Sequence, residues 1–300
     1  MTGNGRILCV GRIYCDLVFS GLDAGPAPGR EVFAERLALC AGGGAYITAA
    51  YLSALGQEAS LLGVLPGAPF TGHVTREMAE NGVISHCTGQ APGEDPQITV
   101  ALAHDGDRAF VTRRSGAALV LQKGAGLPGA AHLHIGELTT ALEHPDLIGV
   151  ARGQGMTVSL DCSWDARALT DPRAAGLIAA VDLFLPNRAE MQALTENAIA
   201  VAPRVAVVVK CGAEGAEAIP AGGAALSCPA SPADPLDTTG AGDAFNAGFL
   251  VAWRAGRDLA DCLALANRCG ALAVARLGGA GQLPDLRDLA AQVLPMGQGQ

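Results

Sequence analysis

Short apolar runs recur along the chain and predict the strands of a buried sheet. The first, Arg6–Val10 (RILCV), is apolar at successive positions and ends at Gly11. An uninterrupted apolar run of this length is typical of a central strand that is covered on both faces. Similar strand candidates follow at Ala59–Val64, His132–Ile135, Thr157–Leu160, Leu183–Pro186 and Arg204–Val209.

Helical stretches lie between several of these runs. Ala45–Leu55 and Gly72–Asn81 predict helices, and Gly82 closes the second one. Two Ala-rich stretches, Gly240–Ala255 and Leu259–Leu277, predict two more helices near the C-terminus. Because strands and helices that alternate at this spacing form parallel βαβ units, the pattern predicts an α/β fold with a doubly wound, mostly parallel sheet.

In two other segments, apolar and polar residues alternate over short runs, which is typical of strands that lie outside the main core. Residues 17–39 combine turn residues with short alternating pieces, which predicts small strands. Residues 97–114 contain a clear hairpin, with two alternating runs around His104-Asp105-Gly106-Asp107. We expect these two segments to pair as a small β-sheet lid on a single domain that spans residues 1–300.

Composition and charge narrow the classes of partner. Half of the chain is hydrophobic, 16% is charged and 4% is aromatic, which excludes a disordered chain and indicates a core of Ala, Val, Leu and Ile. The formal net charge of −9 argues against a general nucleic-acid binder, because neutralising phosphates needs clustered Lys and Arg. A small anionic ligand is still compatible with this net charge, because backbone N–H donors can hold phosphate in an acidic protein.

Neither a membrane span nor a metal-binding cysteine motif is predicted. The stretch Leu37–Gln57 is uncharged, but the glycines at 42–44 and its polar side chains make it a poor transmembrane candidate. The N-terminus has no apolar segment of signal-peptide length, so we expect a cytoplasmic protein. The nine cysteines form no CxxC pair, which indicates reduced thiols rather than a zinc or thioredoxin-type site.

The string Asp237-Thr-Thr-Gly-Ala-Gly-Asp243 carries the most chemical information. A glycine-rich turn here enters a predicted helix, so the amides of Gly240, Ala241 and Gly242 point outward at the positive end of that helix. Such a geometry binds an oxyanion or a phosphate. Asp243 stands in the first helical turn, where its carboxylate would either cap these donors or act as a base beside a bound phosphoryl group.

Other phosphate-binding machineries are excluded by the residues themselves. The chain has only two lysines, Lys123 and Lys210, and neither belongs to a GxxxxGK[ST] loop. It also lacks the HRD and DFG motifs of protein kinases, the GxSxG elbow and the HExxH zinc motif. Phosphoryl transfer by this chain would therefore rest on backbone amides, a metal ion and one carboxylate.

The string DTTGAGDAF resembles the C-terminal signature of the ribokinase-like, PfkB-type carbohydrate kinases. Further markers of that family occur in the right order over nearly the whole chain. They are Asp16 after the first strand, Gly42-Gly43 before the first helix, Asn187 with Glu190, Lys210 with Gly212 and Gly215, and Asn267 in the Ala-rich end. The resemblance implies a three-layer α/β/α sandwich with a β-sheet lid, and ATP-dependent phosphorylation of a hydroxymethyl group.

The resemblance also implies roles at the acceptor side of the site. Asp243 is similar to the general base that takes the proton of the acceptor hydroxyl, and the Gly240–Gly242 amides resemble an anion hole for the γ-phosphoryl group. Asp16 looks like the carboxylate that accepts two sugar hydroxyls, together with the backbone at Gly42 and Gly43. Glu137 lies where some members of the family place another sugar contact.

At the nucleotide side, the resemblance implies a bound metal and ATP. Asn187 and Glu190 are similar to the motif that organises Mg²⁺, often through water. Lys210 begins the nucleotide marker, Gly212 and Gly215 stand where the nucleotide passes close to the backbone, and Asn267 belongs to the adenine-side helix. Asp237 occupies a position associated with a monovalent cation such as K⁺ in some relatives.

Structural explanations compete with several of these roles. Asp16 would also satisfy turn amides at a strand end, and Asn187 with Glu190 would also start a helix. The glycines at 42–44 would also serve close helix packing alone. His132 and His134 alternate on a predicted strand and share a face, which favours a buried pair over a metal site.

Position 47 departs from the family pattern. Relatives commonly carry Asn five residues after the first glycine of this element, where it helps to read sugar hydroxyls, whereas this chain has Ile47. Gly44 also stands where ribokinases often have Lys. We therefore expect altered recognition of the acceptor, with ribose not favoured and a sugar or sugar derivative ahead of a nucleoside.

The sequence thus predicts a phosphotransferase that acts on an alcohol group of a small sugar-like acceptor. A nucleoside kinase is the alternative enzyme, and a non-catalytic sugar or nucleotide sensor on the same fold is the alternative from another class. By family resemblance we expect a homodimer formed through the lid strands.

Overall fold

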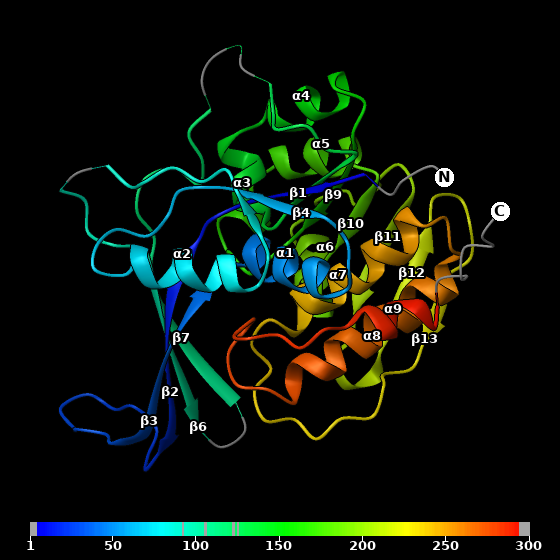
Figure 1. Cartoon of the computed structure of the whole chain (residues 1–300). Coiled ribbons are helices and arrows are strands. Elements are labelled where there is room, and N and C mark those ends of the chain that lie inside the picture. The colour runs from blue at the N-terminus through cyan, green and yellow to red at the C-terminus, as the bar shows by residue number, and fades with distance from the viewer. Residues whose placement is uncertain (1–4, 92, 105–106, 122–123, 125, 294–300) are drawn as a thin grey trace.

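Two β-sheets with flanking helices make up the fold (Figure 1). The computed structural model describes residues 5–91, 93–104, 107–121, 124 and 126–293. Residues 105 and 106, at the tip of the predicted hairpin, lie outside the described residues. Figure 1 shows the smaller sheet projecting from the helix-covered larger one.

The large sheet has nine strands in the order β13-β12-β11-β10-β9-β8-β1-β4-β5. Strands β11 to β5 in this order are parallel, and β12 and β13 add an antiparallel edge. The bounds are β1 Ile7–Val10, β4 Ala59–Leu62, β5 Ile84–Ser85, β8 His132–Ile135, β9 Thr157–Asp161, β10 Leu183–Leu185, β11 Ala206–Lys210, β12 Ala216–Pro220 and β13 Leu226–Cys228. The prediction of a doubly wound, mostly parallel sheet is confirmed.

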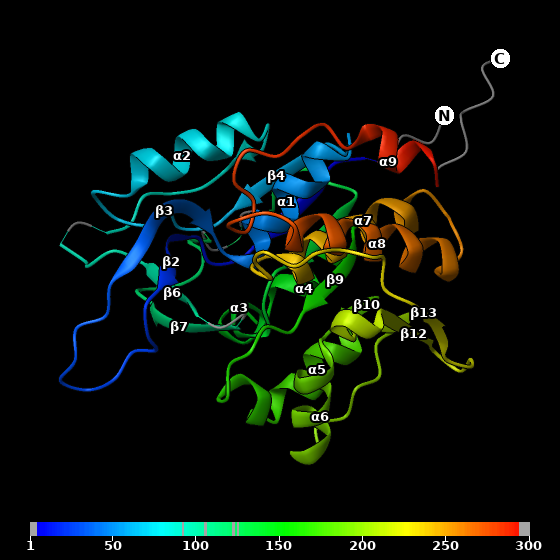
Figure 2. The ribbon, with the colours of Figure 1, turned by 90° about the horizontal axis from the view of Figure 1, so that it is seen from below.

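Helices cover both faces of this sheet and give the three layers that were predicted. On β1, Ile7 and Cys9 belong to one core and Leu8 and Val10 to the other, because successive side chains point to opposite faces. Figure 2 shows the two helical layers on either side of the strands. One layer holds α1 Gly44–Ala54, α2 Thr71–Glu80, α7 Ala241–Arg254, α8 Leu259–Val274 and α9 Arg287–Ala291, and the other holds α3 Leu138–Glu143, α4 Leu147–Gly153, α5 Arg173–Ala180 and α6 Arg188–Glu196.

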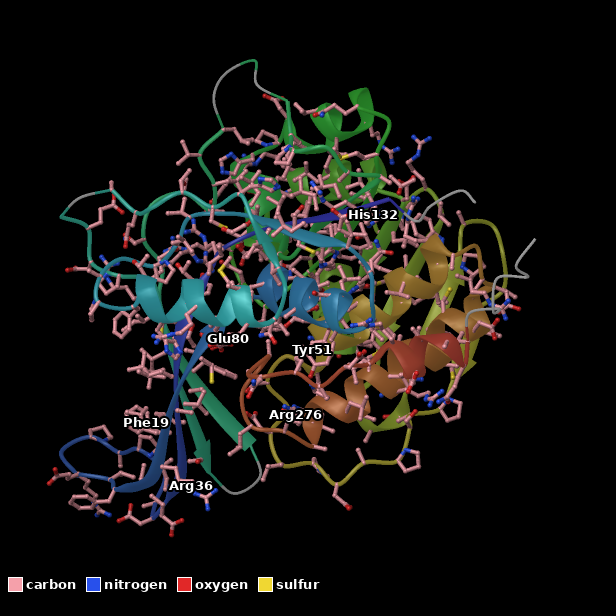
Figure 3. The ribbon with its side chains drawn as sticks, in the orientation of Figure 1. Phe19, Arg36, Tyr51, Glu80, His132 and Arg276 are labelled. Atoms are coloured by element: carbon pink, nitrogen blue, oxygen red, sulfur yellow. The ribbon has the colours of Figure 1, made fainter. Side chains whose placement is uncertain are left out.

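The smaller sheet has the order β3-β2-β6-β7 and unites the two segments that were expected to pair. It comprises β2 Tyr14–Leu22, β3 Ala34–Gly42, β6 Ile98–His104 and β7 Asp107–Arg113. Figure 3 labels Phe19 and Arg36 on its projecting part, far from His132 on the large sheet. Its strands begin and end closer to the large sheet than expected, so Asp16 lies within β2 and Gly42 ends β3.

The helix predicted to reach Leu277 ends earlier, at Val274. A loop with Gly278 at φ +77° follows, and the Gly278 amide donates to the Asp237 carboxylate (2.8 Å). This loop therefore continues into the site instead of extending α8. Among the described residues, no helix is long and apolar enough to cross a membrane.

Candidate active site

The Gly240 turn is built by the residues around it. Gly240 is the N-cap residue of α7. Its φ of +73° is a left-handed conformation that glycine adopts without strain. The Asp237 carboxylate accepts hydrogen bonds from the Thr239 amide (2.9 Å), the Thr239 hydroxyl (2.7 Å) and Gly278. Asp237, which was expected near a monovalent cation, thus holds the loop on both sides of the turn.

The predicted anion hole lies at the N-terminus of α7. The first amides of a helix have no acceptor within the helix, so the positive end of α7 faces outward here. The Ala241 amide is already engaged, since it donates to the Thr238 carbonyl over 3.3 Å. This geometry leaves Gly240 and Gly242 as the stronger candidates for donors to a phosphoryl group.

The Asp243 carboxylate turns toward the first residue of α1. Its Oδ1 lies 2.8 Å from where a Cβ atom on Gly44 would stand, and the Gly136 carbonyl oxygen lies 3.0 Å from the same point. Thr48 on α1 donates its hydroxyl to the Asp243 carbonyl oxygen (3.2 Å), which ties α1 to α7. Burial, and then the negative charge of Asp161, raise the pKa of Asp243 to about 7, although Lys210 lowers it.

Asp16 approaches the same glycine run from the smaller sheet. Its carboxylate atoms lie 2.1–2.3 Å from where a Cβ on Gly42 would stand, and the Arg12 carbonyl oxygen lies 2.2 Å from that place on Gly43. Gly43 also has φ +102°. Each glycine thus has a separate steric reason, and close helix packing alone does not account for the run.

Glu77 on α2 supports this acceptor side and was missed by the sequence analysis. It accepts hydrogen bonds from the Ala41 amide (2.8 Å) and the Tyr46 hydroxyl (3.1 Å), so it fixes the backbone that leads into Gly42. Burial, and then the charge of Glu77, raise the pKa of Asp16 to about 7. An acidic residue on the apolar stripe of a helix, here beside Met78, was the available signal.

Glu137 is held by hydrogen bonds, and Ile47 is held by apolar packing. The Glu137 carboxylate accepts from the Arg12 amide (3.3 Å) and the Thr140 hydroxyl (2.6 Å), and burial raises its pKa. Ile47 is 3% exposed, and its Cδ1 and Cγ2 atoms fill the spaces that Cβ atoms on Gly279 and Gly240 would need. Ile47 therefore packs beneath the Gly240 turn.

A second polar group, Asp161 with Lys210 and Asn246, meets the first turn of α7. The Lys210 ammonium donates to both oxygens of Asp161 (2.8 and 2.9 Å), and the Asn246 amide donates to Asp161 Oδ2 (2.5 Å). Lys210 was predicted as a nucleotide contact, whereas Asp161 and Asn246 were not singled out. Asp161 stands at the carboxyl end of a parallel strand, and this position was the signal that could have identified it.

Asn187 and Glu190 form a capping box at the start of α6. Asn187 Oδ1 accepts from the Glu190 amide (2.9 Å), and Glu190 Oε2 accepts from the Asn187 amide (2.8 Å). Burial, and then Asp161, raise the pKa of Glu190 to about 7, while Lys210 lowers it. Three acids, Asp161, Glu190 and Asp243, thus share one buried cation, and this excess of negative charge suits a divalent ion.

The structure gives less support to a metal ion that is bound directly by protein side chains. Within the part of the chain that the structure describes, no group of three His, Cys, Asp or Glu residues is arranged to hold a metal ion. His132 and His134 share a face, as predicted, and both contact the Ser159 hydroxyl (2.8 and 2.9 Å). Burial lowers the pKa of both imidazoles, that of His134 to about 4, so this pair is neutral at physiological pH.

Two of the predicted nucleotide residues, Gly215 and Asn267, meet at the end of β13. A Cβ on Gly215, which has φ +101°, would lie 2.1 Å from the Cys228 carbonyl oxygen. The Asn267 amide donates to the same carbonyl (3.2 Å) and to that of Pro229 (3.0 Å). By contrast, no atom lies within 4 Å of a Cβ on Gly212, which leaves space above that residue.

Several known proteins are similar to this chain over most of its length. A model of the pfkB family carbohydrate kinases matches residues 4–286. An ATP-dependent ribose-1-phosphate kinase of Halopiger xanaduensis is 30% identical over 290 residues, which cover 91% of this chain and 93% of that protein. A nucleoside kinase of Methanothermobacter thermautotrophicus is 25% identical and covers 95% of this chain and 94% of its own.

A solved structure shares the fold at lower sequence identity. The crystal structure of an uncharacterized sugar kinase from Pyrococcus horikoshii in complex with ATP has a TM-score of 0.79 and 19% identity. It covers 96% of this chain and 100% of its own. The likeness in fold therefore extends over nearly the whole chain.

Proposed function

The chain belongs to the pfkB family of carbohydrate kinases, which are ATP-dependent phosphotransferases, and from this premise we propose that it phosphorylates a hydroxymethyl group of a sugar or sugar derivative. Asp243 is the general base in this proposal. The proton of the acceptor hydroxyl passes to the Asp243 carboxylate, the acceptor oxygen bonds to the γ-phosphorus, and ADP leaves with the electrons of the broken P–O bond.

One observation supports the proposal most strongly, namely that a single glycine run admits both Asp16 and Asp243. Gly42 makes room for the first carboxylate and Gly44 for the second. An acceptor whose hydroxyls are held by Asp16 would therefore lie within reach of Asp243, and the positive end of α7 lies beside it. The Gly240 and Gly242 amides would then stabilise charge on the transferring phosphoryl group.

ATP is proposed to lie over Gly212, Gly215 and Asn267, with its phosphates directed to the Gly240 turn. The buried acids fit a divalent ion, and Asn187 and Glu190 would hold Mg²⁺ largely through water. Bound Mg²⁺ would neutralise part of the phosphate charge. K⁺ beside Asp237 is a weaker proposal, because that carboxylate already serves the loop.

The acceptor is proposed to be a sugar or sugar derivative rather than a nucleoside. A relative named as a ribose-1-phosphate kinase supports the first, and a relative named as a nucleoside kinase supports the second. The low aromatic content of 4% disfavours an extensive base-stacking pocket. Glu137, which already bonds to Arg12, would line this side.

We also propose the wider assembly that the family resemblance implies. Residues 1–300 would form one kinase domain in the cytoplasm, with segments 17–39 and 97–114 as the lid. Leu37, Leu39 and Val111 are exposed on the smaller sheet, which supports a homodimer through its strands.

An acceptor panel with coupled detection of ADP release tests the function. Ribose, ribose 1-phosphate, fructose, sugar acids and nucleosides are each offered with ATP and Mg²⁺, and reactions without acceptor give the background. We expect a sugar derivative to give the fastest release, and Asp243→Asn to slow it by about 10²- to 10⁴-fold with nucleotide binding nearly unchanged. An Asn variant of full activity would exclude Asp243 as the base, and faster release with nucleosides would favour the alternative kinase.

A further inference from the structure

Asp161 is a fully bonded carboxylate at the carboxyl end of β9. Its Oδ1 accepts from the Cys162 amide (2.7 Å) and from Lys210, and its Oδ2 accepts from Lys210 and from Asn246. Three donor groups thus make four hydrogen bonds to one carboxylate. Asp161 is therefore suited to hold other groups in place and not to exchange protons with a substrate.

Lys210 is directed at the first turn of α7. Its Nζ lies 3.5 Å from where a Cβ on Gly242 would stand, and its Cδ and Cε atoms lie 3.6 and 3.8 Å from the same point. The ammonium thus lies against the turn whose amides face the expected phosphoryl group. Glycine at 242 keeps the space between the ammonium and the turn open.

Asn246 links this ion pair to α7. It follows Asp243 by three positions and so lies on the same side of the helix. Its Oδ1 accepts from Lys210 (3.3 Å) while its amide donates to Asp161, and the side chain is fully buried. The ammonium is consequently fixed relative to the helix that carries both Gly242 and Asp243.

The negative charges around this turn require a cation that is fixed in place. Asp161, Glu190 and Asp16 are the other charged groups that act on Asp243, and Lys210 is the cation among the groups so identified in the described chain. Cys9 on β1 and Tyr51 on α1 also feel the Asp243 charge, but burial raises their pKa values and keeps them neutral. Asp161 raises the pKa of Lys210 despite its burial, so the ammonium stays charged.

We infer that Asp161 and Asn246 are positioning residues that hold the Lys210 ammonium beside Gly242, where it contacts the transferring γ-phosphoryl group of ATP. This inference rests on the proposed function, and it adds a side-chain contact to the γ-phosphoryl group to the amides, metal ion and base expected for phosphoryl transfer. Lys210 keeps its proton throughout, since its task is to stabilise charge on phosphoryl oxygens. The absence of a Walker lysine is thereby offset by a lysine on β11.

The relative affinity for ATP and ADP tests the inference without any acceptor. ADP lacks the γ-phosphoryl group, so a contact to that group contributes only to binding of ATP or its non-hydrolysable β,γ-imido analogue. Calorimetry with Mg²⁺ should show that Lys210→Met lowers the preference for the analogue over ADP by about 10- to 100-fold. Asp161→Asn should lower it in the same direction but less, and Lys210→Arg should keep part of it.

Asp182→Asn is the matched control. Asp182 is also a buried acid, paired with Arg152 (3.0 Å) and with the Val158 amide (2.7 Å), but it lies at the opposite end of β9 and β10. A merely structural loss would weaken binding of both nucleotides equally, as expected for this control. An unchanged analogue-to-ADP ratio in folded Lys210→Met would overturn the inference, and if Asp161→Asn does not fold, Asn246→Ser takes its place.

Turnover separates this inference from the proposed function. If the wild type phosphorylates an acceptor, Lys210→Met should lower kcat by about 10²- to 10³-fold with a smaller change in the KM of the acceptor. If no acceptor is phosphorylated, the proposed function fails, while the nucleotide preference still decides the role of Lys210. An altered acceptor KM with unchanged kcat would contradict the phosphoryl contact.

Discussion

The Asp243 carboxylate occupies the space that a side chain on Gly44 would need, with Oδ1 2.8 Å from the position of a Cβ atom. The first residue of α1 thereby sets where the base can lie. The Thr48 hydroxyl on α1 bonds to the Asp243 backbone 195 positions further along the chain, and this bond joins the two elements.

Gly44→Ala should therefore displace the base without unfolding the chain. A methyl group there meets both Asp243 and the Gly136 carbonyl, and a shift of about 1 Å at a reacting group can cost about 10²-fold in rate. Steady-state kcat is the measurement. Gly149→Ala, on α4 where a Cβ meets no atom within 4 Å, should leave kcat unchanged, and equal effects in both variants would remove the steric argument.

Activity and stability should respond to pH in opposite directions. Asp243 accepts a proton only when ionised, and its pKa is raised to about 7, so kcat/KM should fall as the pH drops from 8 to 6. A pH–rate profile of the metal-saturated enzyme checks this. An acid limb near pH 4 would show that Asp243 titrates like an exposed aspartate.

The free energy of unfolding of the metal-free protein should change with the reverse sign. The pKa values of Asp16, Glu190 and Asp243 are all raised to about 7 in the folded state, above the unfolded values. Their contribution to stability is therefore fully present below the unfolded pKa values and is lost as the pH rises through 7. Tm should rise between pH 8 and pH 5.5, and a Tm that falls steadily over this range would contradict the shifts.

Glu190→Gln should separate metal binding from helix capping. Gln at this position can keep the reciprocal bond to the Asn187 amide, so α6 and thermal stability should change little. Loss of the carboxylate charge should raise the Mg²⁺ concentration needed for half-maximal rate. An unchanged Mg²⁺ dependence would leave Glu190 with the helix start alone.

Ile47→Asn should lower stability. The Ile47 side chain fills apolar space beneath Gly240 and Gly279, and an amide buried there without partners costs about 1–3 kcal/mol. Chemical denaturation against Ile47→Val, which costs about 0.5–1.5 kcal/mol, gives the comparison. The same variant, kept below its Tm, tests whether Asn at this position improves the use of ribose and fructose, as the departure from the family pattern predicts.

The sequence predicted the sheet well because its central strands are covered on both faces. Such strands are continuous apolar runs bounded by turn residues, and His132–Ile135 was found with its exact ends. The edge strands β5 and β13 are short and largely exposed, so no apolar run marks them. β2 starts at Tyr14 instead of 17, because its buried first residues read as part of the turn after β1.

The site was predictable where one short string contains its residues. The turn from Asp237 to Asp243 is local, so its geometry follows from its own glycines and the helix that it begins. The Asp161–Lys210 pair joins strands 49 positions apart, and no local pattern specifies such a partner. Glu77 likewise acts on Ala41 through a helix that follows an intervening strand.

The two carboxylates of the site are held by different parts of the fold, and these parts meet at Arg12. Its guanidinium binds the carbonyls of Ser115 and Gly116, which follow β7, and the amide oxygen of Gln97 ahead of β6, while its backbone amide donates to Glu137. Asp16 lies on β2 of the smaller sheet, whereas Asp243 lies on α7 in a helical layer of the large sheet. A rotation of the smaller sheet about Arg12 would change the distance between the Asp16 and Asp243 carboxylates. A water molecule is too small to contact both sheets at once, so it could not fix this distance.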